Sequence, residues 1–243
     1  MASRLPEVPA LLVRNYMAGV NTMIRGKPAL GKTATINAFV EKMKTRVEGF
    51  RCWQFYAPTM SPMDIQASAP DYERNVLRMF NNEALPNAYT DPDAVGIVFF
   101  GEFPNADPAT AKLLQKYVNG EDMSGVLRKP AGVVVVADGN RIEDKSGVQQ
   151  QARALMSRFE QIDVFSDAQD NIDFAAKGGW HPMVQLYFKD NPAQIDNYDE
   201  VFETSSAARQ RGQEAKAANG HDRMSEEGKI GIWANMRSWE RIS

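Results

Sequence analysis

Short apolar segments recur along the chain as far as residue 165, and stretches with helical periodicity separate most of them. Residues 97–100 and 133–136 are continuously apolar, as strands must be when both of their faces are buried. The predicted strands are 22–25, 51–56, 96–100, 132–137 and 162–165. Alternation of strands with helices predicts an α/β fold in which a five-stranded parallel sheet is flanked by helices.

Three segments carry the helical pattern. After the first strand, apolar residues recur at the spacing of one helix face: Ile36, Phe39, Val40, Met43 and Val47. A second helix is expected to begin at Asp107 and Pro108, an N-cap followed by proline at the first helical position. Its predicted buried face consists of Ala111, Leu114, Tyr117 and Val118. A third helix is expected near 148–156.

The pattern changes after residue 165. Apolar residues gather around 184–188 and again around 230–239, whereas 205–223 is polar and fits either an exposed helix or a loop. We therefore expect two domains, an α/β domain over 1–165 and a small helical domain over 166–243 that has no sheet of its own.

Composition narrows the class of protein. The chain has 243 residues, of which 43% are hydrophobic and 24% charged, as is ordinary for globular proteins. A net charge of −3 and scattered basic residues give no reason to expect nucleic acid as a partner. Cys52 is the only cysteine, so an intramolecular disulfide and a cysteine metal cluster are excluded. The sequence shows no secretory signal and no apolar stretch near the ~18 residues of a membrane span, which predicts a cytoplasmic location.

The first strand leads into a G-x-x-x-x-G-K-T sequence, and a helical pattern follows it. In such a phosphate loop, backbone N–H groups surround phosphates at a helix N-terminus. Lys32 would neutralise the terminal phosphates and the Thr33 hydroxyl would hold Mg²⁺. The candidate binding residues are Gly26, Lys27, Pro28, Ala29, Leu30, Gly31, Lys32, Thr33 and Ala34. The alternative is a glycine-containing turn before an ordinary helix.

Three further residues fit phosphate chemistry. Glu102 follows the strand 96–100, at the sheet edge where ligands bind, and is placed to polarise an attacking water. Asn140 follows the next strand as a candidate sensor of the terminal phosphate, and Arg158 precedes the last strand, where it could reach a neighbouring subunit's nucleotide. The alternatives are a solvated carboxylate for Glu102, a turn former for Asn140 and a surface ion pair for Arg158.

In order and spacing, these motifs resemble those of an AAA+ ATPase and are most similar to the MoxR-like group. GKPALGKT matches the Walker A loop, and IVFFGEFPNADPATAKLLQ resembles the Walker B strand with its following helix. VVVVADGNRIEDKSG resembles the sensor 1 segment, ALMSRFEQIDV the arginine-finger segment, and MRSWE near the end of the chain the sensor 2 region.

The resemblance implies ATP and Mg²⁺ as cofactors. Glu102 would be the catalytic glutamate, Asn140 sensor 1 and Arg158 a finger acting in trans. Arg237 would be sensor 2 and contact the nucleotide, although packing or an ion pair near the tryptophans explains it equally well. Residues 166–243 would form the helical lid. Residues 58–88 would hold a helical insert, and 120–130 a β-hairpin.

The resemblance also implies partners. Members assemble into rings, usually hexamers, and use ATP turnover to remodel proteins, often with a von Willebrand A domain partner. A DNA-associated motor is a further AAA+ function that the acidic balance of the chain disfavours.

Two departures from the family pattern stand out. The acid that normally precedes the catalytic glutamate is replaced by Gly101, so we expect weaker metal positioning unless a water or a neighbouring acid such as Asp138 compensates. Slow hydrolysis, or a nucleotide-binding scaffold that does not turn ATP over, is the alternative that this glycine raises. The chain also stops at Ser243, immediately after the sensor 2 segment, which implies a shortened or truncated lid.

Overall fold

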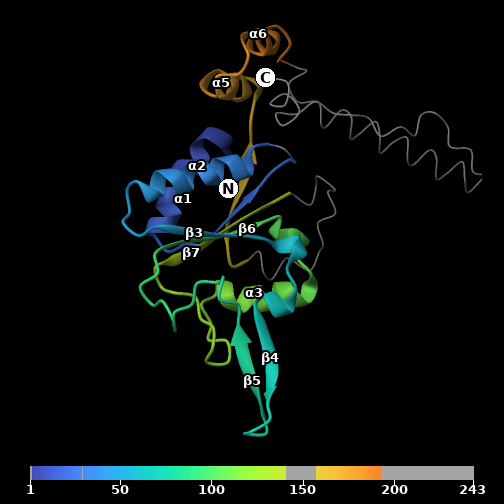
Figure 1. The fold of residues 1–243 in the computed structure, drawn as a ribbon. Coiled ribbons are helices and arrows are strands. Elements are labelled where there is room, and N and C mark those ends of the chain that lie inside the picture. The colour runs from blue at the N-terminus through green and yellow to red at the C-terminus, as the bar shows by residue number, and fades with distance from the viewer. Residues whose placement is uncertain (1, 29, 141–156, 193–243) are drawn as a thin grey trace, which may run out of the picture. The chain divides into compact units, whose positions relative to one another are not determined.

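The computed structural model describes residues 2–28, 30–140 and 157–192. The chain divides into two units, Met1–Phe165 and Ser166–Ser243, each of which is considered by itself. Figure 1 shows the elements of both.

The first unit contains a sheet of six parallel strands in the order β1-β8-β2-β7-β6-β3. These strands are β1 (Ala2–Arg4), β2 (Thr22–Arg25), β3 (Arg51–Tyr56), β6 (Gly96–Gly101), β7 (Val133–Gly139) and β8 (Glu160–Phe165). The five predicted strands are all present, and β1 adds an edge strand that the sequence pattern did not predict. The predicted α/β fold with a parallel sheet flanked by helices is confirmed.

Helices cover both faces of this sheet, which explains its continuously apolar strands. Figure 1 shows α1 (Val8–Met17) and α2 (Lys32–Lys44) on one face and α3 (Pro108–Val118) on the other. Successive residues of a strand point to opposite faces. Ile97 and Phe99 accordingly share a buried cluster with residues of α1 and α2, whereas Val98 and Phe100 share one with residues of α3. The described part of the unit also contains short 3-10 turns at Leu5–Glu7, Ala57–Thr59, Pro62–Asp64 and Phe103–Asn105.

Helix α3 begins where its sequence signal places it. The Asp107 carboxylate accepts hydrogen bonds from the backbone N–H groups of Ala109 at 2.9 Å and Thr110 at 3.3 Å. Pro108 occupies the first helical position, where no intrahelical N–H bond is needed. The predicted N-cap is therefore confirmed.

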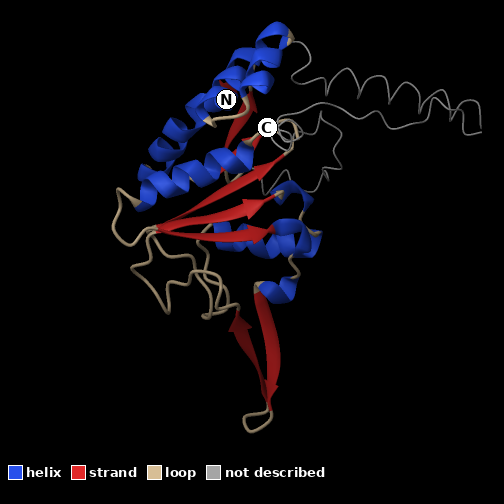
Figure 2. Cartoon of the chain, turned by 45° about the horizontal axis from the view of Figure 1, so that its top comes forward, coloured by secondary structure: helices blue, strands red, loops and turns tan. Residues whose placement is uncertain are grey.

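Two expectations drawn from the family resemblance are wrong. Residues 58–88 contain an antiparallel hairpin, β4 (Gln66–Asp71) with β5 (Val76–Asn81), instead of a helical insert, and Figure 2 shows it apart from the main sheet. Asn75, with a φ of 53°, occupies the left-handed region in the turn that closes this hairpin, a conformation that asparagine tolerates well. Residues 120–130 have only a single antiparallel bridge, between Met123 and Leu127, where a hairpin was expected.

The described residues of the second unit form two helices, α5 (Ala168–Lys177) and α6 (Pro182–Asp190). Asp167 caps α5 by accepting a hydrogen bond from the Asp170 N–H group. The Trp180 ring lies against Phe174 and Phe188, with ring centroids 6.0 and 6.1 Å apart, and joins the two helices. The helix expected at 148–156 and the apolar cluster at 230–239 lie outside the described residues.

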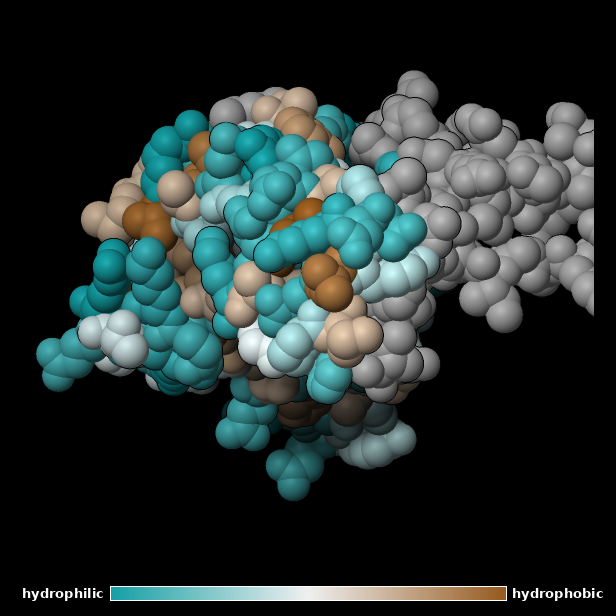
Figure 3. All heavy atoms as spheres, turned by 90° about the horizontal axis from the view of Figure 1, so that it is seen from above, coloured by the Kyte–Doolittle hydropathy of each residue, from teal (hydrophilic) through white to brown (hydrophobic). Residues whose placement is uncertain are grey.

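Polar side chains dominate the described surface that Figure 3 shows, where hydrophobic residues are isolated. Elsewhere, the β4–β5 hairpin exposes 87% of Tyr72 and 70% of Leu77. Within the described ranges, every helix is too short or too polar to cross a bilayer.

Candidate nucleotide-binding site

The phosphate loop connects the carboxyl end of β2 to the first turn of α2, which begins at Lys32. Two of its glycines are required by the backbone. Gly31 has a φ of 91°, in the left-handed region that favours glycine. A Cβ atom on Gly26 would lie 2.8 Å from the Val164 carbonyl oxygen, so only glycine lets the loop approach β8 this closely. The remaining described loop residues are Lys27, Pro28, Leu30, Lys32, Thr33 and Ala34.

The residue before the loop fixes it to the sheet. The Arg25 guanidinium donates two hydrogen bonds to the Asp163 carboxylate, at 2.8 and 2.9 Å. Arg25 and Asp163 are register partners on β2 and β8. This bidentate ion pair therefore joins the two strands at the residue immediately before Gly26.

Lys32 is only 6% exposed, and its ammonium group is held at the start of α2. Its Nζ atom donates hydrogen bonds to the carbonyl oxygens of Gly26 at 2.8 Å and Lys27 at 2.7 Å, and to Asn140 Oδ1 at 3.1 Å. A cation and the N–H groups of a helix N-terminus are thereby brought together, and both favour a bound anion.

Asn140 connects this lysine to Glu102. Asn140 Nδ2 lies 3.5 Å from Glu102 Oε2, and Asn105 Nδ2 donates to the same oxygen at 3.1 Å. Glu102 has a φ of 51°, a left-handed conformation that is uncommon for a side chain of this kind and that occurs often at functional sites. The structure therefore brings Lys32, Asn140 and Glu102 to one edge of the sheet.

Asp138 is the neighbouring acid that the sequence analysis named beside Gly101, but the sequence did not define its contacts. It is 3% exposed, and its Oδ2 atom accepts a hydrogen bond from the Thr33 hydroxyl at 2.9 Å. Its Oδ1 atom accepts another from the Glu102 backbone N–H at 2.8 Å. A hydroxyl and a carboxylate are oxygen ligands of the kind Mg²⁺ prefers, so these residues fit that ion. Among the described residues, no cluster of three or more His, Cys, Asp or Glu side chains is placed to hold a metal ion.

Arg158 is not brought to this site. It is exposed and lies two residues before the amino end of β8, whereas the phosphate loop follows the carboxyl end of the parallel strand β2. Because Thr22 pairs with Glu160, and strands rise about 3.3 Å per residue, Arg158 lies on the order of 20 Å from Gly26 along the strands. Ala29 and Arg237 lie outside the described residues.

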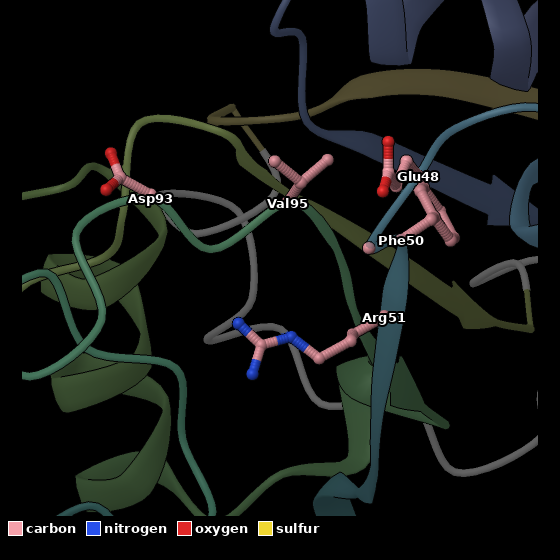
Figure 4. Close-up of a pocket in the computed structure, with 6 residues that line it drawn as sticks. Glu48, Phe50, Arg51, Asp93 and Val95 are labelled. Atoms are coloured by element: carbon pink, nitrogen blue, oxygen red, sulfur yellow. The ribbon is translucent and has the colours of Figure 1, made fainter.

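A separate depression of about 400 Å³ lies at the opposite edge of the sheet, near the amino ends of β3 and β6 (Figure 4). Its lining includes Glu48, Arg51 and Asp93. Arg51 also pairs with Asp91 and lies over the Trp53 ring, 4.7 Å from its centroid. Phosphates held at the loop would not reach this pocket, because the strands run between them.

No protein-family model and no curated protein matches the sequence. Among solved structures, a candidate ATPase from Cytophaga hutchinsonii is similar at 17% identity, with 86% of this chain and 66% of that chain covered and a TM-score of 0.47. The chain thus spans just under two thirds of that protein. A mutant of RuvB from Thermotoga maritima is similar at 13% identity, with 98% of this chain and 68% of that chain covered and a TM-score of 0.45. The fold assignment rests on the strand order and the phosphate loop of the chain itself.

Proposed function

We propose that the chain is an ATPase of the AAA+ class that binds ATP and Mg²⁺ at the carboxyl edge of its parallel sheet. One observation carries the proposal: a phosphate loop whose lysine is linked through Asn140 to the carboxylate of Glu102. A cation that binds phosphate and a carboxylate that can orient water are the two groups that phosphoryl transfer to water requires.

Each residue has a part in this reaction. Lys32 and the N–H groups at the start of α2 bind the phosphates, and Glu102 orients the attacking water and accepts its proton. Asn140 contacts both the lysine and the carboxylate and keeps them at a fixed separation. The Thr33 hydroxyl would hold Mg²⁺, and the bound ion would offset the negative charge of the phosphate oxygens. Arg158 acts on the nucleotide of a neighbouring subunit.

The finer assignment is a MoxR-like ATPase that forms a ring, usually of six subunits, and remodels a protein client in the cytoplasm. Its support is the order of the motifs from Gly26 to Arg237. A von Willebrand A domain protein is the partner class that the resemblance favours. The exposed Tyr72 and Leu77 of the β4–β5 hairpin offer apolar surface of the kind that client binding uses.

Steady-state hydrolysis by wild type and Glu102→Gln tests the proposal. We expect Glu102→Gln to lower the turnover number by about 100-fold or more while ATP affinity is retained, since the amide keeps the shape of the side chain but cannot accept the proton. Glu73→Gln, at an exposed position in the hairpin turn, is the matched control and should hydrolyse ATP as wild type does. Unchanged turnover in Glu102→Gln would contradict the assigned role.

A second candidate function is favoured by Gly101. If the missing acid is not replaced, the chain binds ATP and is ordered by it without turnover. ATP binding by wild type with no detectable hydrolysis, and hydrolysis gained on Gly101→Asp, would select this scaffold over the ATPase.

A further inference from the structure

Asp138 occupies a central position among the candidate site residues. Its two carboxylate oxygens accept hydrogen bonds from different elements. Oδ2 accepts from the hydroxyl of Thr33 in the first turn of α2, and Oδ1 accepts from the backbone N–H of Glu102 after β6. The side chain is buried at the carboxyl end of β7, so both of its oxygens are held in place. A fixed, negatively charged group therefore faces the hydroxyl that is the candidate Mg²⁺ ligand.

The position that lacks the family's acid is next to this carboxylate. Gly101 ends β6, the strand adjacent to β7, and a Cβ atom built on it would lie 3.9 Å from Asp138 Oδ1 and 3.5 Å from the Tyr56 ring. A side chain at position 101 is thus sterically possible. An aspartate there would, however, bring a second carboxylate close to that of Asp138, and like charges at such a distance disfavour each other.

We propose that Asp138 supplies the carboxylate that positions Mg²⁺ with Thr33, in place of the acid missing at position 101. The inference rests on the proposed function, because it concerns the same nucleotide site. Either Asp138 on β7 or an acid at position 101 on the adjacent strand β6 can supply one negative charge at this place in the site. In this chain the charge comes from β7, and Gly101 on β6 leaves room for it.

A purely structural role for Asp138 would consist of its two hydrogen bonds. Asp138→Asn separates this role from the proposed one, because the amide keeps both bonds: its oxygen accepts from the Glu102 N–H and its NH₂ group donates to the Thr33 hydroxyl. What the substitution removes is the charge. The Mg²⁺ dependence of ATP binding should therefore change, whereas folding and ATP binding without metal should not.

Binding of a fluorescent ATP analogue, measured in EDTA and over a range of MgCl₂ concentrations, tests this. For Asp138→Asn we expect the same affinity for the analogue as wild type in EDTA. Mg²⁺ should raise this affinity only at higher concentrations: the Mg²⁺ concentration that gives half of the increase in affinity should be about 10- to 100-fold higher than for wild type. Gly101→Asp combined with Asp138→Asn should restore the wild-type Mg²⁺ dependence. Asp93→Asn, exposed at the opposite edge of the sheet, is the control and should match wild type.

The outcomes separate the two proposals. If Asp138→Asn binds the analogue with the Mg²⁺ dependence of wild type, the metal-positioning role is wrong and the ATPase proposal is unaffected. If wild type binds no analogue in either condition, both proposals fail. Should Asp138→Asn not fold by circular dichroism, Asp138→Ser takes its place, with the same expected shift and the same contradicting result.

Discussion

Asn140 contacts both the candidate phosphate-binding lysine and the candidate base. We expect Asn140→Ala to lower the rate of ATP hydrolysis in a single-turnover assay by about 100-fold, the typical cost of removing one preorganised donor from a reacting site. ATP affinity should change by less than about threefold, because the loop and the N-terminus of α2 remain to bind phosphate.

The control for this prediction is Asn119→Ala, which removes an exposed amide just after α3. It should leave both the rate and the affinity at the wild-type values. A loss of affinity as large as the loss of rate in Asn140→Ala would show that Asn140 acts in binding and not in the reaction.

The residues of this site differ in how far the sequence could place them. Lys32, Glu102 and Asn140 each follow a predicted strand, and parallel strands bring their carboxyl ends to one edge, so their proximity could be predicted. The contacts of Asp138 could not. They depend on the register that pairs Ile24 with Asp138 and on a side-chain rotamer, and neither is encoded in a local pattern.

At the scale of elements, α3 depends on a buried tyrosine. Tyr117 is fully buried, its hydroxyl donates to the Pro86 carbonyl oxygen at 2.8 Å, and burial raises the pKa of the phenol above its ordinary value. The unfolded chain releases this proton near pH 10, whereas the folded chain retains it. The free energy of unfolding should therefore fall as the pH rises above about 10, by up to about 1.4 kcal/mol per pH unit from this group.

Tyr117→Phe should remove that contribution. In urea unfolding between about pH 9 and pH 11, the free energy of unfolding should fall less steeply with pH for the variant than for wild type. The difference in slope should correspond to about one proton, or up to about 1.4 kcal/mol per pH unit. At pH 7 the variant should be less stable by about 1 kcal/mol, because the Pro86 carbonyl loses its buried donor. Equal slopes in the two proteins would show that the hydroxyl is not protected in the folded state.

Prediction succeeded for elements with a strong local pattern. Buried strands such as β6 and β7 are apolar over most of their length, and α3 carries both an N-cap and a first-turn proline. The β4–β5 hairpin was missed because a helical insert was assumed from the family resemblance, although Val76, Met79 and Phe80 suit a strand. β1 was missed because three residues are too few to show a period.

At the scale of the whole molecule, the parallel sheet separates two of the groups that the proposed reaction needs. The phosphate loop lies at the carboxyl edge of the first unit and Arg158 at the amino edge. The pairing of β2 with β8 keeps the loop and Arg158 at opposite ends of the strands. One copy of the chain therefore does not bring Arg158 to its own loop. In the proposed assembly, a second copy joined head to tail would present its Arg158 to the first copy's nucleotide. Repetition of such a contact gives a ring when its rotation closes.

Mixing two inactive variants tests this arrangement. Lys32→Ala lacks the phosphate-binding cation and Arg158→Ala lacks the finger, so each alone should hydrolyse ATP at a small fraction of the wild-type rate. In a 1:1 mixture, about a quarter of the contacts join an intact loop to an intact finger, so about a quarter of the wild-type rate should return. Either variant mixed with the double variant Lys32→Ala/Arg158→Ala forms no such contact and should stay inactive. If light scattering shows that the two variants assemble together and no activity returns, Arg158 does not act across the interface.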